Sequence, residues 1–428
     1  MASYSETLSS IYNLRGGIID LRLDRMDRAL ALFDHPEEKF ISFHIAGTNG
    51  KGSTAAMLHS ILLLQGYRPA LYTSPHLVSF TERIRVGAEE ISRDEVVELA
   101  EEINVRTRVA DIQLTFFEFI TVMAFIHFFR QQVEVAVIEV GLGGRLDATN
   151  LVRPIVSLIT TISKDHEAYL GSDIVSIAQE KGGIIKENVP AVCGALPAAA
   201  NGAIRQIAAQ RHAPVYFLEQ DFSFSLKSQG YFDYKGPEWQ LKELFVGLRG
   251  RHQRANASVA LAALEFARTA FPVAESAVRE GLRTVFWPGR FETIGNRPTV
   301  VLDGAHNGEG VKALVEELEQ FRDGRKIKLL FASMEDKDWR LMLGTLSALA
   351  DEVVVTRVSM ARSADPNLLG NHLSGKVPSR VIESSSAAVR YVLDQAKDDD
   401  IILVTGSLYL LGEVRPILYR QSGLRDRS

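Results

Sequence analysis

The 428-residue sequence predicts an α/β fold with two domains. We expect a larger N-terminal domain with a mostly parallel sheet and helices on both faces, and a smaller, Rossmann-like C-terminal domain. Two observations predict this fold. Short β-branched runs alternate with amphipathic helical patterns along the chain, as parallel sheets require. The run VEVAVIEV at 133–140 is rich in valine, which is typical of a strand covered on both faces.

The elements follow from local patterns, taken in chain order. In the first half we expect strands at 40–45, 133–140, 155–162 and 190–193, and helices at 53–65 and 172–185. Gly66 gives the first of these helices its C-terminal stop. Residues 217–245 alternate polar and aromatic side chains, which predicts a small antiparallel ribbon.

The second half repeats this order. Here we expect strands at 299–302, 326–331, 353–356 and 401–405, and helices at 308–321 and 387–397. The turn-rich segments 287–290 and 296–298 make the best domain boundary. We therefore predict a phosphate-loop ATPase-like domain at 1–294 and an α/β domain at 295–428.

Composition excludes several classes of protein. The net charge is −5, so there is no sequence-wide basic field for nucleic acid. A lone cysteine, Cys193, rules out an internal disulfide framework and fits a reducing compartment. The N-terminus lacks a signal-peptide pattern, and the apolar segment 116–129 is too short and too polar for a bilayer. We expect a cytoplasmic protein without membrane contact, and a monomer, since nothing demands a dimer.

The stretch HIAGTNGKGST, at 44–54, predicts a phosphate-binding loop between a strand and a helix. Its glycines allow backbone N–H groups to curl around phosphate oxygens at a helix N-terminus. Lys51 can reach the terminal phosphates, and Ser53 can approach a magnesium ion. Only two residues separate Gly47 from Gly50, which is shorter than the common pattern. The alternative is a tight strand–helix turn.

Polar groups also end three other predicted strands. Glu139 ends the strand at 133–140, and His166 lies just after the strand at 155–162. These two side chains could share a divalent cation near the loop, although a lone histidine is more often structural. In the second half, Asp303 and His306 follow a strand and precede a helix. Helix capping by Asp303 or Asn307 is the alternative there.

With these residues assembled, the chain resembles the folylpolyglutamate synthase/dihydrofolate synthase family, relatives of the Mur peptide ligases. The resemblance spans nearly the whole chain, and its signatures stand in the family's order. They are HIAGTNGKGS, YTSPHLVSFTERI, LTFFEF, EVGLGGRLDATN, DHEAYLG, EKGGIIK, HQRANA, PGRFE, DGAHN and TGSLYL. One departure is Gly183, where many relatives have alanine, and we expect it to matter little.

The resemblance implies ATP-dependent amide ligation. In such enzymes the acceptor carboxylate attacks the γ-phosphate of ATP, which gives an acyl phosphate and ADP. The amino group of L-glutamate then displaces phosphate. The acceptor would be dihydropteroate, a reduced folate, or both. This chemistry agrees with the residues, because two anions must meet and cations have to screen them.

The resemblance also assigns roles. The catalytic residues would be Lys51, Lys181 and His306. ATP would contact Gly47, Thr48, Asn49, Gly50, Lys51, Gly52, Ser53, Asn256, Arg290, Asp303 and His306. Mg²⁺ would be held by Ser53, Ser74, Glu139, His166 and Lys181, the last as its carbamate. From its sequence pattern alone, Lys181 reads as a solvated helix lysine.

The acceptor side is implied in the same way. It would comprise Ser74, Arg83, Thr115, Phe117, Asp147 and Ala148. An aromatic ring for stacking and a carboxylate for the 2-amino group suit a pterin, although Phe116 and Phe117 could be ordinary core aromatics. Residues 333–338 are the expected glutamate neighbourhood.

Three other readings of the sequence remain. The first is a Mur-type ligase acting on a cell-wall precursor. The second is a phosphate-loop regulatory ATPase that ligates nothing, and the third is a nucleotide-binding scaffold without turnover. A slow ATPase indifferent to glutamate and folate would favour the second, and ATP binding without turnover would favour the third.

Overall fold

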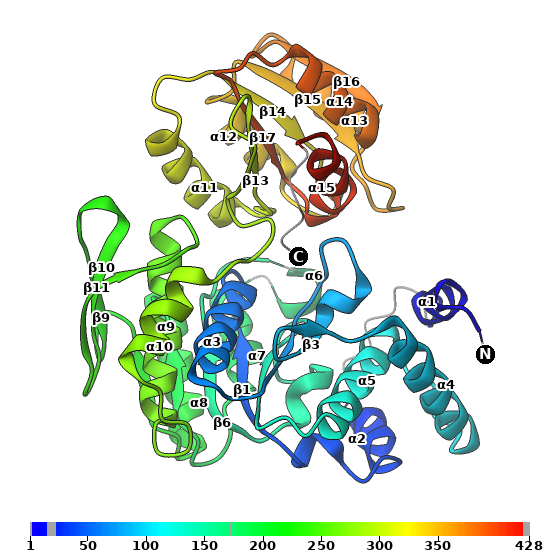
Figure 1. The fold of residues 1–428 in the computed structure, drawn as a ribbon, viewed down its shortest axis with the longest axis vertical. Helices are drawn as coiled ribbons and strands as arrows, with labels where there is room; N and C mark the ends of the chain where they lie inside the picture. The colour runs from blue at the N-terminus through cyan, green and yellow to red at the C-terminus, as the bar shows by residue number, and fades with distance from the viewer. Residues whose placement is uncertain (1, 15–22, 166, 172, 423–428) are drawn as a thin grey trace. The chain divides into compact units, whose positions relative to one another are not determined.

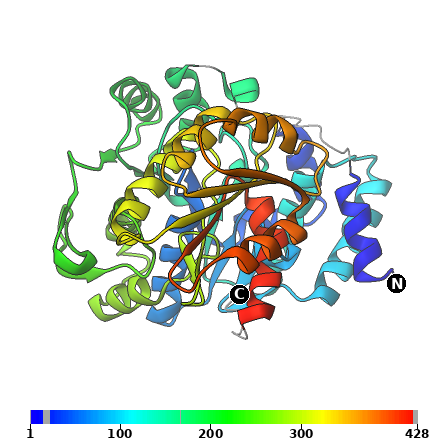
Figure 2. The ribbon, with the colours of Figure 1, turned by 90° about the horizontal axis from the view of Figure 1, so that it is seen from above.

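A computed structural model describes residues 2–14, 23–165, 167–171 and 173–422 (Figure 1). The chain divides into two compact units. The larger comprises 1–76, 80–247 and 253–285, and the smaller comprises 77–79, 248–252 and 286–428. Each unit has its own sheet with helices on both faces, so the predicted fold class is confirmed (Figures 1 and 2). The functional division at residue 294 stays a prediction.

In the described part of the larger unit, the main sheet has eight strands in the order β4-β3-β2-β5-β1-β6-β7-β8. Their bounds are β1 Ile41–Ala46, β2 Pro69–Tyr72, β3 Ile84–Val86, β4 Glu89–Glu90, β5 Val135–Glu139, β6 Pro154–Ile159, β7 Ala191–Cys193 and β8 Val215–Phe217. The six neighbouring strands β2, β5, β1, β6, β7 and β8 pair in parallel. Strands β3 and β4 pair antiparallel and form one edge of the sheet. The order places β5, β1 and β6 side by side, so the residues that follow these strands meet at one edge.

The helices of this unit surround its sheet. Their bounds are α1 Tyr4–Tyr12, α2 Asp24–Ala31, α3 Lys51–Gln65, α4 Arg93–Val109, α5 Phe116–Arg130, α6 Glu167–Leu170, α7 Ile174–Gly182, α8 Ala198–Gln210, α9 Arg251–Ala267 and α10 Glu275–Thr284. Short 3-10 turns lie at Pro36–Glu38 (η1), Phe80–Arg83 (η2), Ala148–Leu151 (η3) and Ser228–Gly230 (η4).

The apolar segment at 116–129 forms the buried helix α5. Phe119 and Phe125 belong to the same buried core cluster as Tyr72 of β2 and Ile138 of β5, which explains the apolar composition of this segment without a bilayer. No helix in the described ranges is long and apolar enough to cross a membrane. Helix α3 packs against β2, β5 and α10.

The predicted ribbon is a three-stranded antiparallel sheet in the order β11-β10-β9 (Figure 1). Its strands are β9 Ser223–Leu226, β10 Tyr231–Lys235 and β11 Gln240–Phe245. The hydroxyl of Tyr234 donates to Glu265 Oε2 at 2.5 Å, which ties this ribbon to α9.

In the smaller unit, the described strands form a six-stranded sheet in the order β12-β13-β17-β14-β15-β16. They are β12 Glu292–Ile294, β13 Thr299–Leu302, β14 Ile327–Phe331, β15 Glu352–Arg357, β16 Ser379–Ser384 and β17 Ile401–Thr405. The helices are α11 Gly308–Phe321, α12 Trp339–Ser347, α13 Pro366–Leu373, α14 Ser385–Gln395 and α15 Leu408–Ser422. Only β12 runs antiparallel. It pairs with β13, although it ends at residue 294 and so lies on the N-terminal side of the predicted boundary.

Candidate active site

The phosphate loop connects β1 to α3, in the context that its sequence predicts. Gly50 is the N-cap of α3 with φ of 88°, a left-handed conformation that favours glycine, and no side chain caps the helix. The first N–H groups of α3 are therefore not satisfied by a side-chain cap, as an anion site at a helix N-terminus requires. Ser53 is buried in the first turn.

The loop backbone is fixed by residues that follow β6. Thr48 N–H donates to Thr161 O at 2.8 Å, and Asn49 N–H donates to Thr161 Oγ1 at 2.9 Å. The Thr160 hydroxyl donates to Asn49 O at 2.6 Å. Both peptide groups are held by a neighbouring segment, so the loop is shaped by the protein itself.

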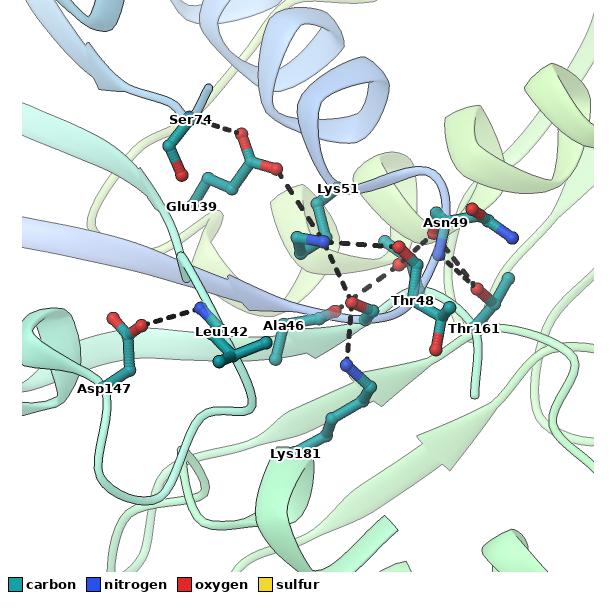
Figure 3. Close-up of polar contacts among 12 residues, drawn as sticks. Ala46, Thr48, Asn49, Lys51, Ser74, Glu139, Leu142, Asp147, Thr161 and Lys181 are labelled. Atoms are coloured by element: carbon teal, nitrogen blue, oxygen red, sulfur yellow. Dashed lines mark hydrogen bonds and ion pairs between the residues drawn. The ribbon is translucent and has the colours of Figure 1, made fainter. Parts of the chain in front are cut away.

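Two lysines converge on one carbonyl oxygen of the loop. Lys51 Nζ and Lys181 Nζ each donate to Gly47 O at 3.0 Å (Figure 3). Lys51 also donates to Thr48 O at 3.3 Å. These bonds use backbone oxygens that a phosphate oxygen can replace as acceptor.

Lys181 lies in α7 and is 4% exposed, so its reading as a solvated helix lysine is wrong. Burial, followed by the nearby charge of Lys51, lowers the pKa of Lys181 to about 7. At neutral pH, roughly half of this amine would therefore be uncharged.

Glu139 supplies a carboxylate beside the loop. It ends β5, is 5% exposed, and accepts the Ser74 N–H at 3.2 Å on Oε2. Its Oε1 lies 4.0 Å from Lys51 Nζ (Figure 3). Ser74 lies in the loop after β2 and Glu139 ends β5, and this hydrogen bond brings the two residues together, whereas their role as metal ligands stays a prediction. His166, the other predicted metal ligand, lies outside the described residues.

The side chains near the loop fit a magnesium ion that is held partly by phosphates and water, rather than a metal ion held by protein side chains alone. Within the described ranges, no group of three or more His, Cys, Asp and Glu side chains could hold a metal ion. Mg²⁺ beside ATP is usually held by one or two protein carboxylates, with phosphates and waters completing its shell. The single buried carboxylate of Glu139 fits that arrangement.

Thr115 begins α5. Its backbone N–H donates to Glu118 Oε2 at 2.7 Å, and its hydroxyl oxygen accepts the Glu118 N–H at 3.4 Å, which together form a capping box. The Arg25 guanidinium clamps the Glu118 carboxylate, with Nη2 to Oε1 at 2.7 Å and Nε to Oε2 at 2.9 Å. Thr115 is therefore part of a buried, charge-supported helix start.

Phe117 and Asp147 meet at the glycine turn after β5. A side chain on Gly141 would collide with the Phe117 ring, so this glycine permits the close approach of the ring. Asp147 accepts from Leu142 N–H at 2.8 Å and from Thr149 N–H at 3.0 Å. Burial raises the pKa of Asp147, although these donors oppose the shift. Ala148 is buried beside it.

Arg83 lies in the loop that follows Ser74. Its Nε–H donates to His76 Nδ1 at 2.7 Å, and its guanidinium lies 5.5 Å from the centroid of the Phe116 ring. Burial, together with the charge of Arg83, lowers the pKa of His76 to about 3. The imidazole is thus neutral and orients Arg83. Phe116 also stacks on Tyr12, at the end of α1, with ring centroids 5.3 Å apart, and it is partly buried against the core.

Asn256, on α9, lies against the phosphate loop. A side chain at Gly50 would collide with the Asn256 amide oxygen, so the two residues are in close proximity. Its Nδ2 donates to Gln253 Oε1 at 3.0 Å, which orients the amide.

In the smaller unit, Asp303 accepts the N–H groups of Phe291 and Ala305, both at 2.9 Å. Burial raises the pKa of Asp303, and the charge of Arg290 opposes that shift. His306 Nδ1 donates to Gly304 O at 2.8 Å, since a carbonyl can only accept. These residues lie together at the end of β13.

Capping accounts for several polar residues of this unit. Asn307 is the N-cap of α11, so the capping alternative is confirmed for that residue. At the predicted glutamate neighbourhood, Asp338 caps α12 and Ser333 is buried.

Sequence reasoning missed three contributors to this site: Thr160, Thr161 and the Arg25–Glu118 pair. The two threonines lie near the end of a predicted strand, in the segment LITTIS at 158–163. This position could have indicated that they contact the phosphate loop. Their bonds reach residues more than 100 positions away, which spacing cannot reveal.

Comparison with known proteins identifies the class. The Mur ligase middle domain matches residues 45–264, and the Mur ligase glutamate ligase domain matches residues 289–408. Together with the fold and the phosphate loop, these matches define a Mur-type ligase.

Individual relatives narrow this class. The dihydrofolate synthase/folylpolyglutamate synthase of Bacillus subtilis is 35% identical, over 92% of this chain and 94% of its own. The Escherichia coli protein of the same name is 33% identical, over 97% and 96%. The chain belongs to the folylpolyglutamate synthase/dihydrofolate synthase family, whose members are ATP-dependent ligases.

Solved structures agree. E. coli FolC in complex with DHPP and ADP superimposes with a TM-score of 0.91 at 32% identity, covering 98% of both chains. A bifunctional folylpolyglutamate synthase/dihydrofolate synthase with Mn, AMPPNP and L-glutamate bound gives a TM-score of 0.88 at 33% identity, again over 98% of both chains.

Proposed function

We propose that this chain joins L-glutamate to the carboxylate of a pterin or folate acceptor, with conversion of ATP to ADP and phosphate. The main support for this proposal is the phosphate loop. There, Lys51 and Lys181 both donate hydrogen bonds to Gly47 O, beside the buried carboxylate of Glu139. Solved relatives hold ADP with DHPP, or AMPPNP with Mn and L-glutamate, and these are the ligands that such a reaction requires.

The chain's own groups explain the first step. The acceptor carboxylate must approach the γ-phosphate of ATP, and both are anions. The backbone N–H groups at the start of α3 and the Lys51 ammonium lower that repulsion when Lys51 leaves its carbonyl partners for phosphate oxygens. The resulting acyl phosphate is then open to the amino group of L-glutamate.

The reaction uses ATP and a divalent metal. We assign Glu139, Ser74 and Ser53 to that metal, with His166 as a further ligand. When bound, the metal neutralises phosphate charge as a Lewis acid. Glu139 is held ready for this role by the Ser74 N–H and by its proximity to Lys51.

Lys181 fits a carbamate. Only an uncharged amine reacts with carbon dioxide, and burial lowers the pKa of Lys181 to about 7. A carbamate would replace one of two neighbouring cations by an anion, which removes a repulsion with Lys51. We assign Lys181 this modified form and a place near the metal.

For the acceptor we assign Thr115, Phe117, Asp147, Ala148 and Arg83. Asn256 in the larger unit, and Arg290, Asp303 and His306 in the smaller, are assigned to ATP, with His306 also catalytic. We further propose that both dihydropteroate and reduced folates are accepted, and that the protein acts as a cytoplasmic monomer on small molecules without nucleic acid.

The test is phosphate release from ATP and Mg²⁺ with L-glutamate, adding dihydropteroate or tetrahydrofolate in separate assays. Stimulation by both acceptors supports a bifunctional enzyme, and stimulation by one alone names the activity. Release that ignores glutamate and both acceptors would contradict the proposal and favour a regulatory ATPase. The Lys51→Ala protein, assayed in parallel, reports any contaminating ATPase.

A further inference from the structure

We infer that Thr149 and His44 are positioning residues, which hold the Asp147 carboxylate and the glycine turn at 141–144 in place for the acceptor. This inference rests on the proposed function, because the acceptor role of Asp147 belongs to it. Neither Thr149 nor His44 has a role in the mechanism derived above.

The Asp147 carboxylate has a donor on each oxygen. Thr149 N–H and the Thr149 hydroxyl reach Oδ1 at 3.0 and 2.5 Å, and Leu142 N–H reaches Oδ2 at 2.8 Å. Asp147 is 4% exposed. A buried carboxylate with donors on both oxygens can rotate only by breaking these bonds, so its orientation is fixed.

The direction of the next bond follows from counting hydrogens. The Thr149 hydroxyl has one hydrogen, and it donates that hydrogen to the carboxylate. Its 2.8 Å contact with His44 Nε2 therefore has the imidazole as donor. His44 is then the neutral tautomer protonated on Nε2. Burial, and then the charge of Lys186, holds the pKa of His44 well below its usual range, which agrees with a neutral ring.

The chain of bonds joins two parts of the site. His44 lies on β1, three residues before Gly47 of the phosphate loop. Thr149 lies in η3, and Asp147 both caps η3 and holds the glycine turn against which Phe117 lies. One hydroxyl thus connects the strand under the phosphate loop with the turn assigned to the acceptor.

Packing alone does not explain why a histidine occupies position 44. His44 is fully buried on β1, and within the described residues its Nδ1 has no hydrogen-bond partner. A buried polar atom without a partner costs free energy, and an apolar side chain on β1 would avoid that cost. The Nε2–H bond to Thr149 is what the imidazole provides.

The test compares Thr149→Val, which keeps shape and removes the hydroxyl, with Thr149→Ser, which keeps it. We expect Thr149→Val to raise the KM for dihydropteroate or tetrahydrofolate about ten-fold, and the KM for ATP less than about two-fold. Thr149→Ser should restore the acceptor KM. Ser157→Ala is the matched control. Ser157 is fully buried opposite His44 in the β1–β6 register, but its hydroxyl donates to Ile184 O.

Several outcomes decide the inference. An unchanged acceptor KM in Thr149→Val, or an equal rise in Ser157→Ala, would overturn it. A parent enzyme indifferent to both acceptors would instead overturn the proposed function, and the acceptor role of Asp147 with it. If Thr149→Val does not fold, the ¹⁵N spectrum of histidine-labelled parent protein decides, with His44 assigned by its absence from His44→Phe. An Nε2–H form supports the network, and an Nδ1–H form contradicts it.

Discussion

The phosphate loop and the glycine turn after β5 follow neighbouring strands of one sheet, yet they use their polar groups differently. In the loop, the charged groups rest on backbone oxygens: Lys51 and Lys181 both donate to Gly47 O. In the turn, the charged group is enclosed, and Asp147 accepts from Leu142 and Thr149.

This difference separates groups that exchange partners from groups that hold a shape. An ammonium on a carbonyl can transfer to a phosphate oxygen with little net loss, because one acceptor replaces another. A buried carboxylate with several donors loses them all if it moves. We therefore expect substitutions in the loop to affect turnover, and substitutions around the turn to affect acceptor binding and stability.

Lys51→Ala should have the largest effect. Removing the charged donor of the phosphate loop should lower kcat by about 10³-fold, measured by phosphate release at saturating acceptor. Lys328→Ala is the matched control, since its side chain is 16% exposed against 18% for Lys51 and its cation pairs with Glu352. If the activity of Lys51→Ala is near that of the parent, Lys51 does not transfer from the loop carbonyls to the phosphate oxygens during turnover.

Lys181→Ala should lower activity by about 10²-fold, and short carboxylic acids should restore part of it by filling the gap. The control is Lys186→Ala. Lys186 is a partly buried lysine that follows α7, and its Nζ donates to Asn150 O at 2.6 Å. Acids should not rescue Lys186→Ala, and a fully active Lys181→Ala would dispose of the carbamate.

The stability of the parent should also depend on Lys181. Its pKa is about 7 in the folded state and near 10.4 in the unfolded state, so between these values only the unfolded chain binds the proton. The free energy of unfolding should therefore rise with pH across this window, by up to about 5 kcal/mol. In buffer free of carbon dioxide, denaturant titrations should show a steeper rise in the parent than in Lys181→Met, since burial also lowers the pKa of Lys186 to about 8 in both proteins.

Glu139→Gln should raise the Mg²⁺ concentration for half-maximal activity by about ten-fold or more, because the metal loses its buried carboxylate. Glu37→Gln is the control, since Glu37 is 4% exposed but pairs with His35. Identical magnesium titrations for Glu139→Gln and the parent would sink the metal assignment.

Thr115→Ala should have the smallest effect on stability, about 1 kcal/mol for the lost cap. Ser92→Ala removes the same kind of capping box from α4. Both variants should lose similar stability, but only Thr115→Ala should raise the acceptor KM. Equal acceptor KM values in the two variants would leave Thr115 with a purely structural part.

Much of the fold could be predicted because strand and helix patterns are local. The helix predicted at 308–321 and the strand predicted at 401–405 coincide with α11 and β17. Helix α5 was missed, since a helix that is apolar all round has no periodic face to recognise. The long helix α4 was also missed.

The site was predictable where a motif is contiguous. Residues 47–53 form one loop and the helix turn that follows it, whereas the burial of Lys181 depends on contacts made by distant segments. Gly183 shows the same limit. It caps α7, and a side chain there would collide with the Cβ of Arg145, so an alanine matters more than helix propensity alone suggests. Only the tertiary structure reveals such a contact.

Thr160 lies between two glycines, and this has an evolutionary consequence. A side chain at Gly47 would collide with the Thr160 hydroxyl, and one at Gly194 with its carbonyl oxygen. Shortening residue 160 could relieve the first collision, but it would also remove the hydroxyl that donates to Asn49 O. No pair of compensating mutations at 47 and 160 therefore keeps both the space and the bond. In a library of random double variants, substitutions at position 47 should therefore be as poorly tolerated with a second change at position 160 as they are alone.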